Sequence, residues 1–371
     1  MKMTQITAPN IFKYATKELS QDAFLCWLFS FAAKKYDNSE FKQLHLLSLD
    51  ILYQFIGDGK IDIREIEVKK QVHKIDIWIE INSNILIIIE DKTNSAAGKG
   101  QLEKYYDIAT EYCNSNNFND PICIYFKTGN EAKNVFSKSN VNGKWKYFSL
   151  EDLHKILHIY QKQIIHPYFQ DFYQLNFERL QVKLEFEKYI SKENQNGFRN
   201  DIIEAFYTRL EQDEVFTNWN YNDSIGNRTY YSNDYVFDSQ KTNVYLQFDR
   251  LDLKLKVDLN KLREEKGPSY KKFQKELKKN NIELIYNDLR HLFLEDPKLK
   301  EKIIRPKKRA THNFLTFAVI PIDQWLFFNS DGKMNYKKSK DNIVKINKDL
   351  KVFTTSNQDR ISAIVEAGFI K

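Results

Sequence analysis

The chain has 371 residues, of which 42% are hydrophobic and 14% aromatic, with 57 basic and 50 acidic side chains. A chain of this length is longer than a domain with a single hydrophobic core usually is, which predicts two domains. Each would have enough apolar residues to fold without disulfide bonds. The three cysteines form no CxxC pair, which argues against a disulfide framework or a zinc site and predicts a reducing, cytoplasmic location. No apolar run approaches the length of a membrane span, so neither export nor membrane insertion is expected.

The N-terminal part begins with two expected helices, over residues 18–36 and 40–56, because apolar residues recur there at helical spacing. Residues 61–70 then alternate between apolar and polar side chains, which predicts a first strand. Further along the chain we expect a helix over about 101–114, a strand at 122–126 and a helix over about 150–165.

Residues 75–92, with the sequence IDIWIEINSNILIIIEDK, carry the most specific pattern in the chain and predict a β-hairpin. A three-residue loop over 82–84 would pair Ile81 with Ile85. Continuing this register places Asp76 opposite Glu90, and directly opposed residues of an antiparallel pair share a face.

The two faces of this hairpin differ sharply. The odd-numbered isoleucines, from Ile75 to Ile89, form an apolar surface that must be buried. The other face holds Asp76, Glu90 and Lys92, whereas the side chain of Asp91 points the opposite way. Opposed Cβ atoms lie roughly 4.5–5.5 Å apart, which suits two carboxylates that share a hard divalent cation.

The triplet from Glu90 to Lys92 carries no weight by itself, because an acidic residue two positions before a lysine occurs eleven times in the sequence. Only this triplet closes a run of five apolar residues and faces an aspartate on the preceding strand. Charges at a strand end are also compatible with a solvated exit, so that interpretation stays open. The nearest competitor, Asp252 to Lys254, opens a plain alternating strand and is interpreted as structural.

The order of these motifs resembles that of the PD-(D/E)XK nuclease superfamily over about residues 10–165. The resemblance rests on Asp76, then Glu90-x-Lys92 at the end of the next strand, then a helix that begins near Gln101 with Tyr105 one turn on. It implies an α/β fold with a restriction-endonuclease-like core, α-βββ-α-β, in which a mixed sheet is flanked by helices.

The first helix extends the resemblance. Residues 18–28, ELSQDAFLCWL, are similar to the opening of an uncharacterised bacterial branch whose members are often associated with defence against foreign DNA. Several branches complete their site with a glutamate from this helix, which implies a metal-binding role for Glu18. Asp22, four residues on, is the alternative ligand. A purely structural interpretation, in which both residues belong to a solvated first turn, stays open. The chain departs from the signature at Ile75, where the motif has a proline.

The resemblance also implies the chemistry of the site. Mg²⁺, with Mn²⁺ able to replace it, would be held by Asp76 and Glu90, with the backbone carbonyl of Asp91 as a further oxygen ligand. The cation would activate the attacking water and stabilise charge on the phosphate. Lys92 would orient that water or neutralise the phosphate, and the sequence leaves open whether desolvation lowers the pKa of its ammonium group. Gln101 would position phosphate or water.

Pro167 and the aromatic-rich residues after it indicate a linker near 166–178, between a domain at 1–166 and a second domain at 178–371. The second domain is expected to be α+β. Its predicted elements are helices at 177–189, 198–210 and 268–280 and strands at about 228–237, 243–249, 252–259, 314–320 and 324–329.

Charge separates the two parts of the chain. Residues 1–175 hold 21 basic and 21 acidic residues, so the whole net charge of +7 lies beyond them. The densest basic pieces are Lys271–Lys279, Arg305–Arg309 and Lys337–Lys340. Lysine runs are usually solvated faces, but a basic domain would also supply nonspecific attraction to phosphates.

Two hypotheses follow. The first is a Mg²⁺-dependent nuclease, in the first place a DNA endonuclease of restriction or phage defence, whose second domain binds nucleic acid or senses a partner. Its partner is nucleic acid, DNA before RNA, and a homodimer is plausible because double-strand cleavage commonly needs two sites. The second is a catalytically silent nucleic-acid-binding or scaffolding module of the same fold. Retention of three charged side chains beside a core favours the first.

Overall fold

The structure is a computed structural model that describes residues 10–14, 18–57, 61–194, 198–216, 219–222, 229–231, 233–238, 243–249, 251–259, 279–306 and 314–370. The chain divides into two compact units, Met1–Leu184 and Glu185–Lys371. Within the described residues, no helix has both the length and the apolar character that crossing a membrane requires.

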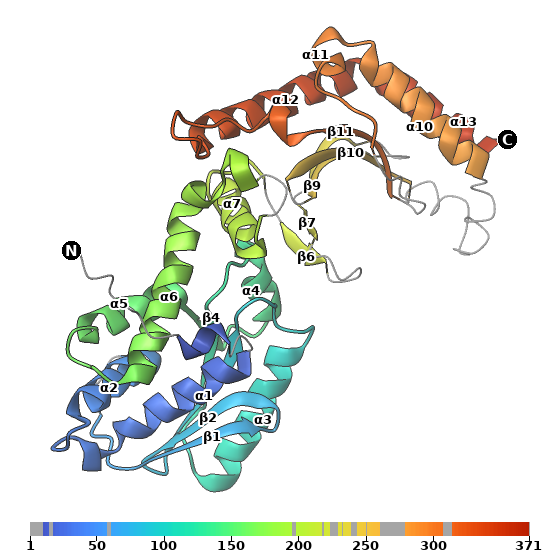
Figure 1. The fold of residues 1–371 in the computed structure, drawn as a ribbon. Coiled ribbons are helices and arrows are strands. Elements are labelled where there is room, and N and C mark those ends of the chain that lie inside the picture. The colour runs from blue at the N-terminus through green and yellow to red at the C-terminus, as the bar shows by residue number, and fades with distance from the viewer. Residues whose placement is uncertain are drawn as a thin grey trace, which may run out of the picture. The chain divides into compact units, whose positions relative to one another are not determined.

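The first unit is built on a five-stranded mixed sheet with the order β1-β2-β3-β4-β5. Strands β1, β2 and β4 of this sheet are labelled in Figure 1. The first three strands are antiparallel neighbours, whereas β3, β4 and β5 run parallel. Its main elements are α1 (Glu18–Phe29), α2 (Lys42–Ile56), β1 (Ile66–Val72), β2 (Ile75–Ile81), β3 (Ile85–Lys92), α3 (Gln101–Asn116), β4 (Ile122–Lys127), α4 (Lys133–Ser139), β5 (Trp145–Ser149), α5 (Leu150–Tyr160) and α6 (Pro167–Glu185). Short 3-10 turns occupy Ile11–Lys13, Ser30–Ala32 and Lys34–Tyr36. The predicted α-βββ-α-β order is confirmed, and the fold is restriction-endonuclease-like.

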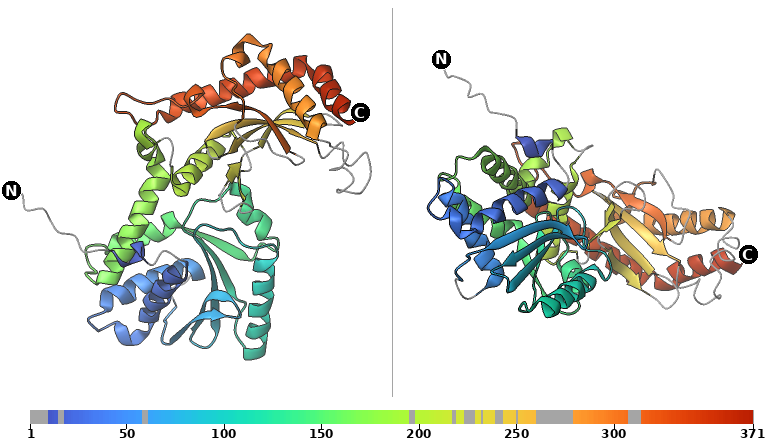
Figure 2. Two further views of the ribbon diagram at one scale, coloured as in Figure 1. Left: turned by 45° about the vertical axis from the view of Figure 1, so that its right-hand side comes forward. Right: turned by 90° about the horizontal axis from the view of Figure 1, so that it is seen from below.

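Helices cover both faces of this sheet, with α3 on one side and α1 and α2 on the other (Figure 2). Ile77, Ile79 and Ile87 pack in the larger core with α1, α2, α5 and α6. Trp78 and Ile88, on the face that also holds the charged residues, form a second core with α3. The charged residues of the hairpin therefore lie at the end of a covered face rather than on an open one.

The register of the hairpin is as predicted. Ile81 pairs with Ile85, and the ladder continues to Ile77 opposite Ile89. One assignment was wrong: Ile75 packs in the α3-side core and not with Ile77. It follows a residue in the left-handed region, Lys74 with φ 71°, where the chain turns into β2, so strict alternation does not extend to the first residue of the strand.

The first strand was predicted too early in the chain. Strand β1 begins at Ile66, because the main-chain N–H groups of Arg64 and Glu65 donate to the side chain of Asn82 instead of joining a ladder. Strand β5 was not predicted at all. It is five residues long and only Trp145 and Phe148 are fully buried, which is too short a signal to separate from a loop.

The expected linker at 166–178 is wrong, because residues 167–178 belong to helix α6. Pro167 stands at its first position, where a proline costs no hydrogen bond. Phe169, Phe172 and Tyr173 follow at helical spacing and are buried in the core of the first unit. The aromatic residues that suggested a boundary are therefore core residues, and the helix continues to the end of the unit.

The second unit contains a four-stranded antiparallel sheet with the order β11-β10-β9-β8 and a two-stranded sheet of β6 and β7. Its described elements are α7 (Asn200–Gln212), β6 (Asn220–Asn222), β7 (Thr229–Tyr231), β8 (Asn233–Asp238), β9 (Asn243–Asp249), β10 (Asp252–Asp258), α10 (Lys279–Leu294), α11 (Pro297–Lys300), β11 (Phe314–Ile320), α12 (Tyr336–Ser356) and α13 (Gln358–Ile370). Short 3-10 turns lie at Phe186–Tyr189, Lys192–Asn194 and Ile322–Gln324.

Several expectations for the second domain differ from the structure. The helix expected at 177–189 is mostly the C-terminal part of α6, and the strand expected at 228–237 is divided into β7 and β8. Residues 324–329 form no strand; a 3-10 turn ends at Gln324, and Phe328 makes only an isolated bridge to Met334. The long helices α12 and α13 were not predicted. The helix expected at 268–280 falls almost wholly outside the described residues.

Candidate functional site

Three charged side chains meet where β2 begins and β3 ends. Lys92 Nζ lies 2.6 Å from Glu90 Oε1, and Glu90 is only 1% exposed. Asp76 acts electrostatically on both, which places its carboxylate in the same group. The pairing that the sequence predicted therefore brings Asp76, Glu90 and Lys92 together.

Helix α3 supplies the next contacts. Gln101, the first residue of this helix, donates from Nε2 to Glu90 Oε1 at 2.7 Å, while its own Oε1 accepts from the N–H of Gly98. The same Nε2 lies 3.2 Å from the Tyr105 hydroxyl, which in turn donates to the carbonyl of Lys74. Gln101 thus holds the Glu90 carboxylate and is itself fixed from two sides.

Asp76 is held through both of its oxygens. Oδ1 accepts from Gln71 Nε2 at 3.1 Å, and Oδ2 accepts from the main-chain N–H of Asp91 at 2.9 Å. Gln71 stands between two paired positions of the β1–β2 ladder, opposite Asp76. It is one of the residues that sequence reasoning missed.

The carboxylates of Asp76 and Glu90 repel one another, and Glu90 is almost inaccessible to water. Burial, followed by repulsion from Asp76, raises the pKa of Glu90 to about 8. Burial also raises the pKa of Asp76, although the hydrogen bond from the Asp91 N–H and the charge of Lys92 oppose this shift. Glu90 Oε2 is buried and no hydrogen-bond donor among the described residues reaches it, so the negative charge of an ionised Glu90 would be only partly compensated.

Two opposing effects act on the pKa of Lys92. Burial alone would lower it, but attraction to Glu90 and Asp76 outweighs the burial, and the net shift of the Lys92 pKa is upward. The ammonium therefore stays charged at neutral pH. It is suited to neutralise a phosphate and unsuited to take a proton from water.

The two candidates on the first helix have different roles. Glu18 Oε1 accepts from the main-chain N–H groups of Thr93 at 2.8 Å and Asn94 at 3.4 Å, so it anchors the loop that follows β3. Asp22 is 1% exposed, and its side chain shares a hydrogen bond with that of Asp91. Burial raises the pKa of Asp22 to about 6.

The Asp91 side chain points away from Glu90, as expected, and enters a buried polar group that the sequence did not predict. Gln21 Nε2 lies 2.7 and 2.9 Å from the two carboxylate oxygens of Asp91. The Gln21 Oε1 atom accepts from Arg179 of α6 at 3.0 Å. Burial raises the pKa of Asp91 well above its usual range. No spacing rule links residues 158 positions apart, so only the buried, helical position of Gln21 could have drawn attention to it.

The donors present suit a hard cation. Mg²⁺ and Mn²⁺ prefer carboxylate and carbonyl oxygens, and the free Oε2 of Glu90 is a buried acceptor of this kind. Within the described ranges, no three His, Cys, Asp or Glu side chains are arranged to hold a metal ion. A cation here would therefore depend on Asp76, Glu90, main-chain oxygen and water.

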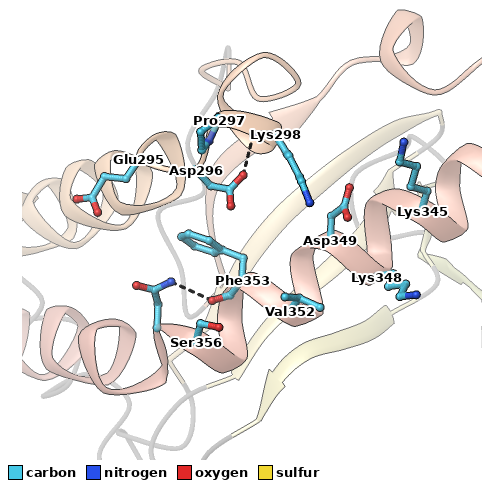
Figure 3. Close-up of a pocket in the computed structure, with 11 residues that line it drawn as sticks. Glu295, Asp296, Pro297, Lys298, Lys345, Lys348, Asp349, Val352, Phe353 and Ser356 are labelled. Atoms are coloured by element: carbon cyan, nitrogen blue, oxygen red, sulfur yellow. Dashed lines mark hydrogen bonds between the residues drawn. The ribbon is translucent and has the colours of Figure 1, made fainter.

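A pocket of about 700 Å³ lies in the second unit, against α11 and α12 (Figure 3). It is lined by charges of both signs, among them Lys298, Lys345 and Asp349. None of the residues in the carboxylate cluster borders it. The pocket is thus distinct from the site that the sequence predicted.

A comparison with protein families agrees with the geometry. The model of the PD-(D/E)XK nuclease superfamily matches residues 9–177. No curated protein and no solved structure matches the chain. The matched segment contains the mixed sheet and all of Asp76, Glu90, Lys92 and Gln101. Residues 9–177 of this chain belong to the PD-(D/E)XK nuclease superfamily.

Proposed function

We propose that this protein is a nuclease that hydrolyses phosphodiester bonds of DNA with a divalent cation, Mg²⁺ or Mn²⁺, at Asp76 and Glu90. One observation carries the proposal: a buried carboxylate with an unpartnered oxygen lies beside a charged lysine and a second carboxylate. A fold that no longer cut nucleic acid would gain stability by losing this cluster, since uncompensated buried charge is costly.

Each residue of the site would have a separate role in this reaction. Asp76 and Glu90 would hold the cation, with the carbonyl of Asp91 and water as further oxygen ligands, while Glu18 would keep the loop after β3 in place. When bound, the cation supplies activation of water and stabilisation of charge on the phosphate. Lys92 would neutralise the charge that develops on the phosphate, because its ammonium keeps its proton. Gln101 would keep Glu90 in place through its 2.7 Å hydrogen bond.

The substrate follows from charge and from the resemblance of the first helix. The N-terminal 175 residues are electrically neutral, and the net charge of +7 belongs to the rest of the chain. A basic second unit supports phosphate attraction that is independent of sequence. We extend the proposal to endonuclease cleavage in defence against foreign DNA, with two copies of the chain acting on the two strands of a duplex.

The test uses the full chain with plasmid, single-stranded DNA and RNA, in Mg²⁺, Mn²⁺ or chelator. We expect cleavage of DNA with either ion and none with chelator. Glu90→Gln and Lys92→Ala should each reduce the rate by at least roughly 100-fold. Glu103→Gln and Lys104→Ala, which make the same chemical changes on the first turns of α3 outside the cluster, should cut like the wild type.

Two results would count against the proposal. Equal cleavage by the Glu90 and Lys92 variants would remove the site assignment. Tight DNA binding without cleavage by any form would instead favour a silent binding module.

A further inference from the structure

Behind the carboxylate cluster, a buried chain of hydrogen bonds connects helix α6 to strand β3. Arg179 of α6 donates to Gln21 Oε1 at 3.0 Å, and Gln21 Nε2 donates to both oxygens of Asp91, at 2.7 and 2.9 Å. The Asp91 main-chain N–H then donates to Asp76 Oδ2 at 2.9 Å. Three links therefore join Arg179 to the carboxylate that is proposed to hold the cation.

The donors and acceptors in this series of hydrogen bonds can be assigned from the chemistry of the side chains. A guanidinium only donates, so the acceptor end of the Gln21 amide must face α6. Its donor end must then face β3, where it also lies 3.3 Å from Thr128 Oγ1. A hydrogen bond from a cation polarises the amide and strengthens the bonds that its other end makes.

The side chains of β3 and α1 that make these hydrogen bonds lie in a region that excludes water. Gln21 is 4% exposed, whereas Asp22, Asp91 and Thr128 are each 1% exposed. Asp22 Oδ1 has no hydrogen-bond partner. A buried pair of carboxyl groups is costly, and replacing such groups by apolar ones is often stabilising. Stability alone gives no reason for this arrangement, but a fixed position for the Asp91 peptide does.

We infer that Gln21 and Arg179 are positioning residues that hold the Asp91 peptide and, through it, Asp76. This inference rests on the proposed function only for its consequence on catalysis, since the hydrogen bonds exist without it. Arg179 lies two residues beyond the segment that matches the family. The nuclease site therefore needs the C-terminal half of α6, which the family comparison does not include.

The first measurement is amide hydrogen exchange in the metal-free full chain. Gln21→Met keeps the length of the side chain but removes its hydrogen bonds, and Arg179→Met removes the donor on α6. Both should speed exchange at the Asp91 N–H by about tenfold, as expected for the loss of one hydrogen bond. Exchange at Ile88 in the middle of β3 should not change. Arg179→Lys keeps a donor and should restore most of the protection.

The control variant lies on the same helix. Lys183→Met removes a cation one turn beyond Arg179, but Lys183 pairs with Glu151 of α5 and not with Gln21. It should leave exchange at Asp91 unchanged.

The second measurement is binding of Mn²⁺, read from the electron paramagnetic resonance signal of the free ion. Gln21→Met and Arg179→Met should weaken it about tenfold, in the range found for residues that orient metal ligands. Lys183→Met should bind as the wild type does.

The outcomes separate the two proposals. If exchange at Asp91 is the same in wild type, Gln21→Met and Arg179→Met, the positioning role is overturned whatever the nuclease assays give. If exchange accelerates but the wild type neither binds Mn²⁺ nor cuts DNA, the proposed function fails and the hydrogen-bond chain stands. Should Gln21→Met lower the melting temperature so far that exchange becomes global, Arg179→Met against Arg179→Lys decides the question alone.

Discussion

The most unusual residue of the site is Glu90, a carboxyl group at 1% exposure with one oxygen unpartnered. Its pKa of about 8 means that, without a cation, it holds its proton near neutral pH. An unfolded chain would release that proton near the ordinary pKa of 4.5. The folded state therefore binds more protons than the unfolded state between these two values, and its stability must fall as pH rises through this window. The raised pKa values of Asp76 and Asp22 act in the same direction.

This sign leads to a prediction for the metal-free protein. Its melting temperature in chelator should fall between about pH 5 and pH 8, and Glu90→Gln should be more stable than the wild type at pH 8. We expect a gain of roughly 1–3 kcal/mol, because the repulsion from Asp76 is removed while Gln101 and Lys92 keep an acceptor. Addition of Mg²⁺ at pH 8 should stabilise the wild type and have little effect on the variant. A melting temperature of the wild type that rises with pH in chelator would contradict the assignment.

At the scale of elements, the site depends on two loops that meet at the ends of parallel strands. The loop after β3 is held by Glu18, which accepts from the Thr93 N–H, and by Lys127, which donates to the carbonyl of Ser95 at 2.7 Å. The loop after β4 lies directly against it. A Cβ atom added to Gly129 would lie 1.9 Å from the carbonyl oxygen of Thr93. Only a glycine fits this approach.

Gly129→Ala should therefore displace the loop after β3 and impair both stability and cleavage. Overpacking of this kind costs about 1–3 kcal/mol, which would be measured as a lower melting temperature. The control is Gly98→Ala in the loop after β3, whose new Cβ would make only ordinary contacts with Gln101. Equal melting temperatures and equal cleavage rates for the two variants would show that the close approach is not required.

Strand elements of the site could be predicted because their side-chain period is short and their partner is close in sequence. The strand register was sufficient to predict that Asp76 lies near Glu90, because a loop of three residues leaves little choice in how the two strands pair. Helix α6 could not be predicted, because a proline and several aromatic residues occur in linkers as well as at the start of a buried helix. The contact between Gln21 and Arg179 spans 158 positions, and no local pattern specifies a contact over such a distance.

For the whole molecule, charge distribution is the feature that bears on substrate binding. The described part of the second unit exposes Lys337 and Lys338 on the first turn of α12. Lys340, on the same helix, is instead paired with Asp213 at 3.0 Å. Lys337 and Lys338 are therefore two of the described lysines of α12 whose contribution to phosphate attraction a charge reversal can test.

The double variant Lys337→Glu, Lys338→Glu should bind duplex DNA more weakly than the wild type, by about tenfold or more at low salt. The slope of log affinity against log salt should also become shallower, because fewer counterions are released. Fluorescence anisotropy in chelator measures both. The matched control reverses Lys35 and Lys162, two exposed lysines of the first unit. If both double variants lose affinity equally, attraction is a matter of net charge and the second unit has no special part in it.

Positive φ angles cluster at the end of β1, which includes Gln71, and in the turn that follows it. Gln71, His73 and Lys74 all have positive φ, at 61°, 51° and 71°, a region that costs roughly 1–2 kcal/mol for a residue with a side chain. A glycine at position 71 would relax this cost, yet the chain keeps a glutamine there whose amide contacts Asp76. Gln71→Gly should then raise the melting temperature and lower the cleavage rate, so that thermal and kinetic assays of one variant move in opposite directions. Such a residue marks a trade-off between robustness and activity, and sequences selected for stability alone would be expected to give it up.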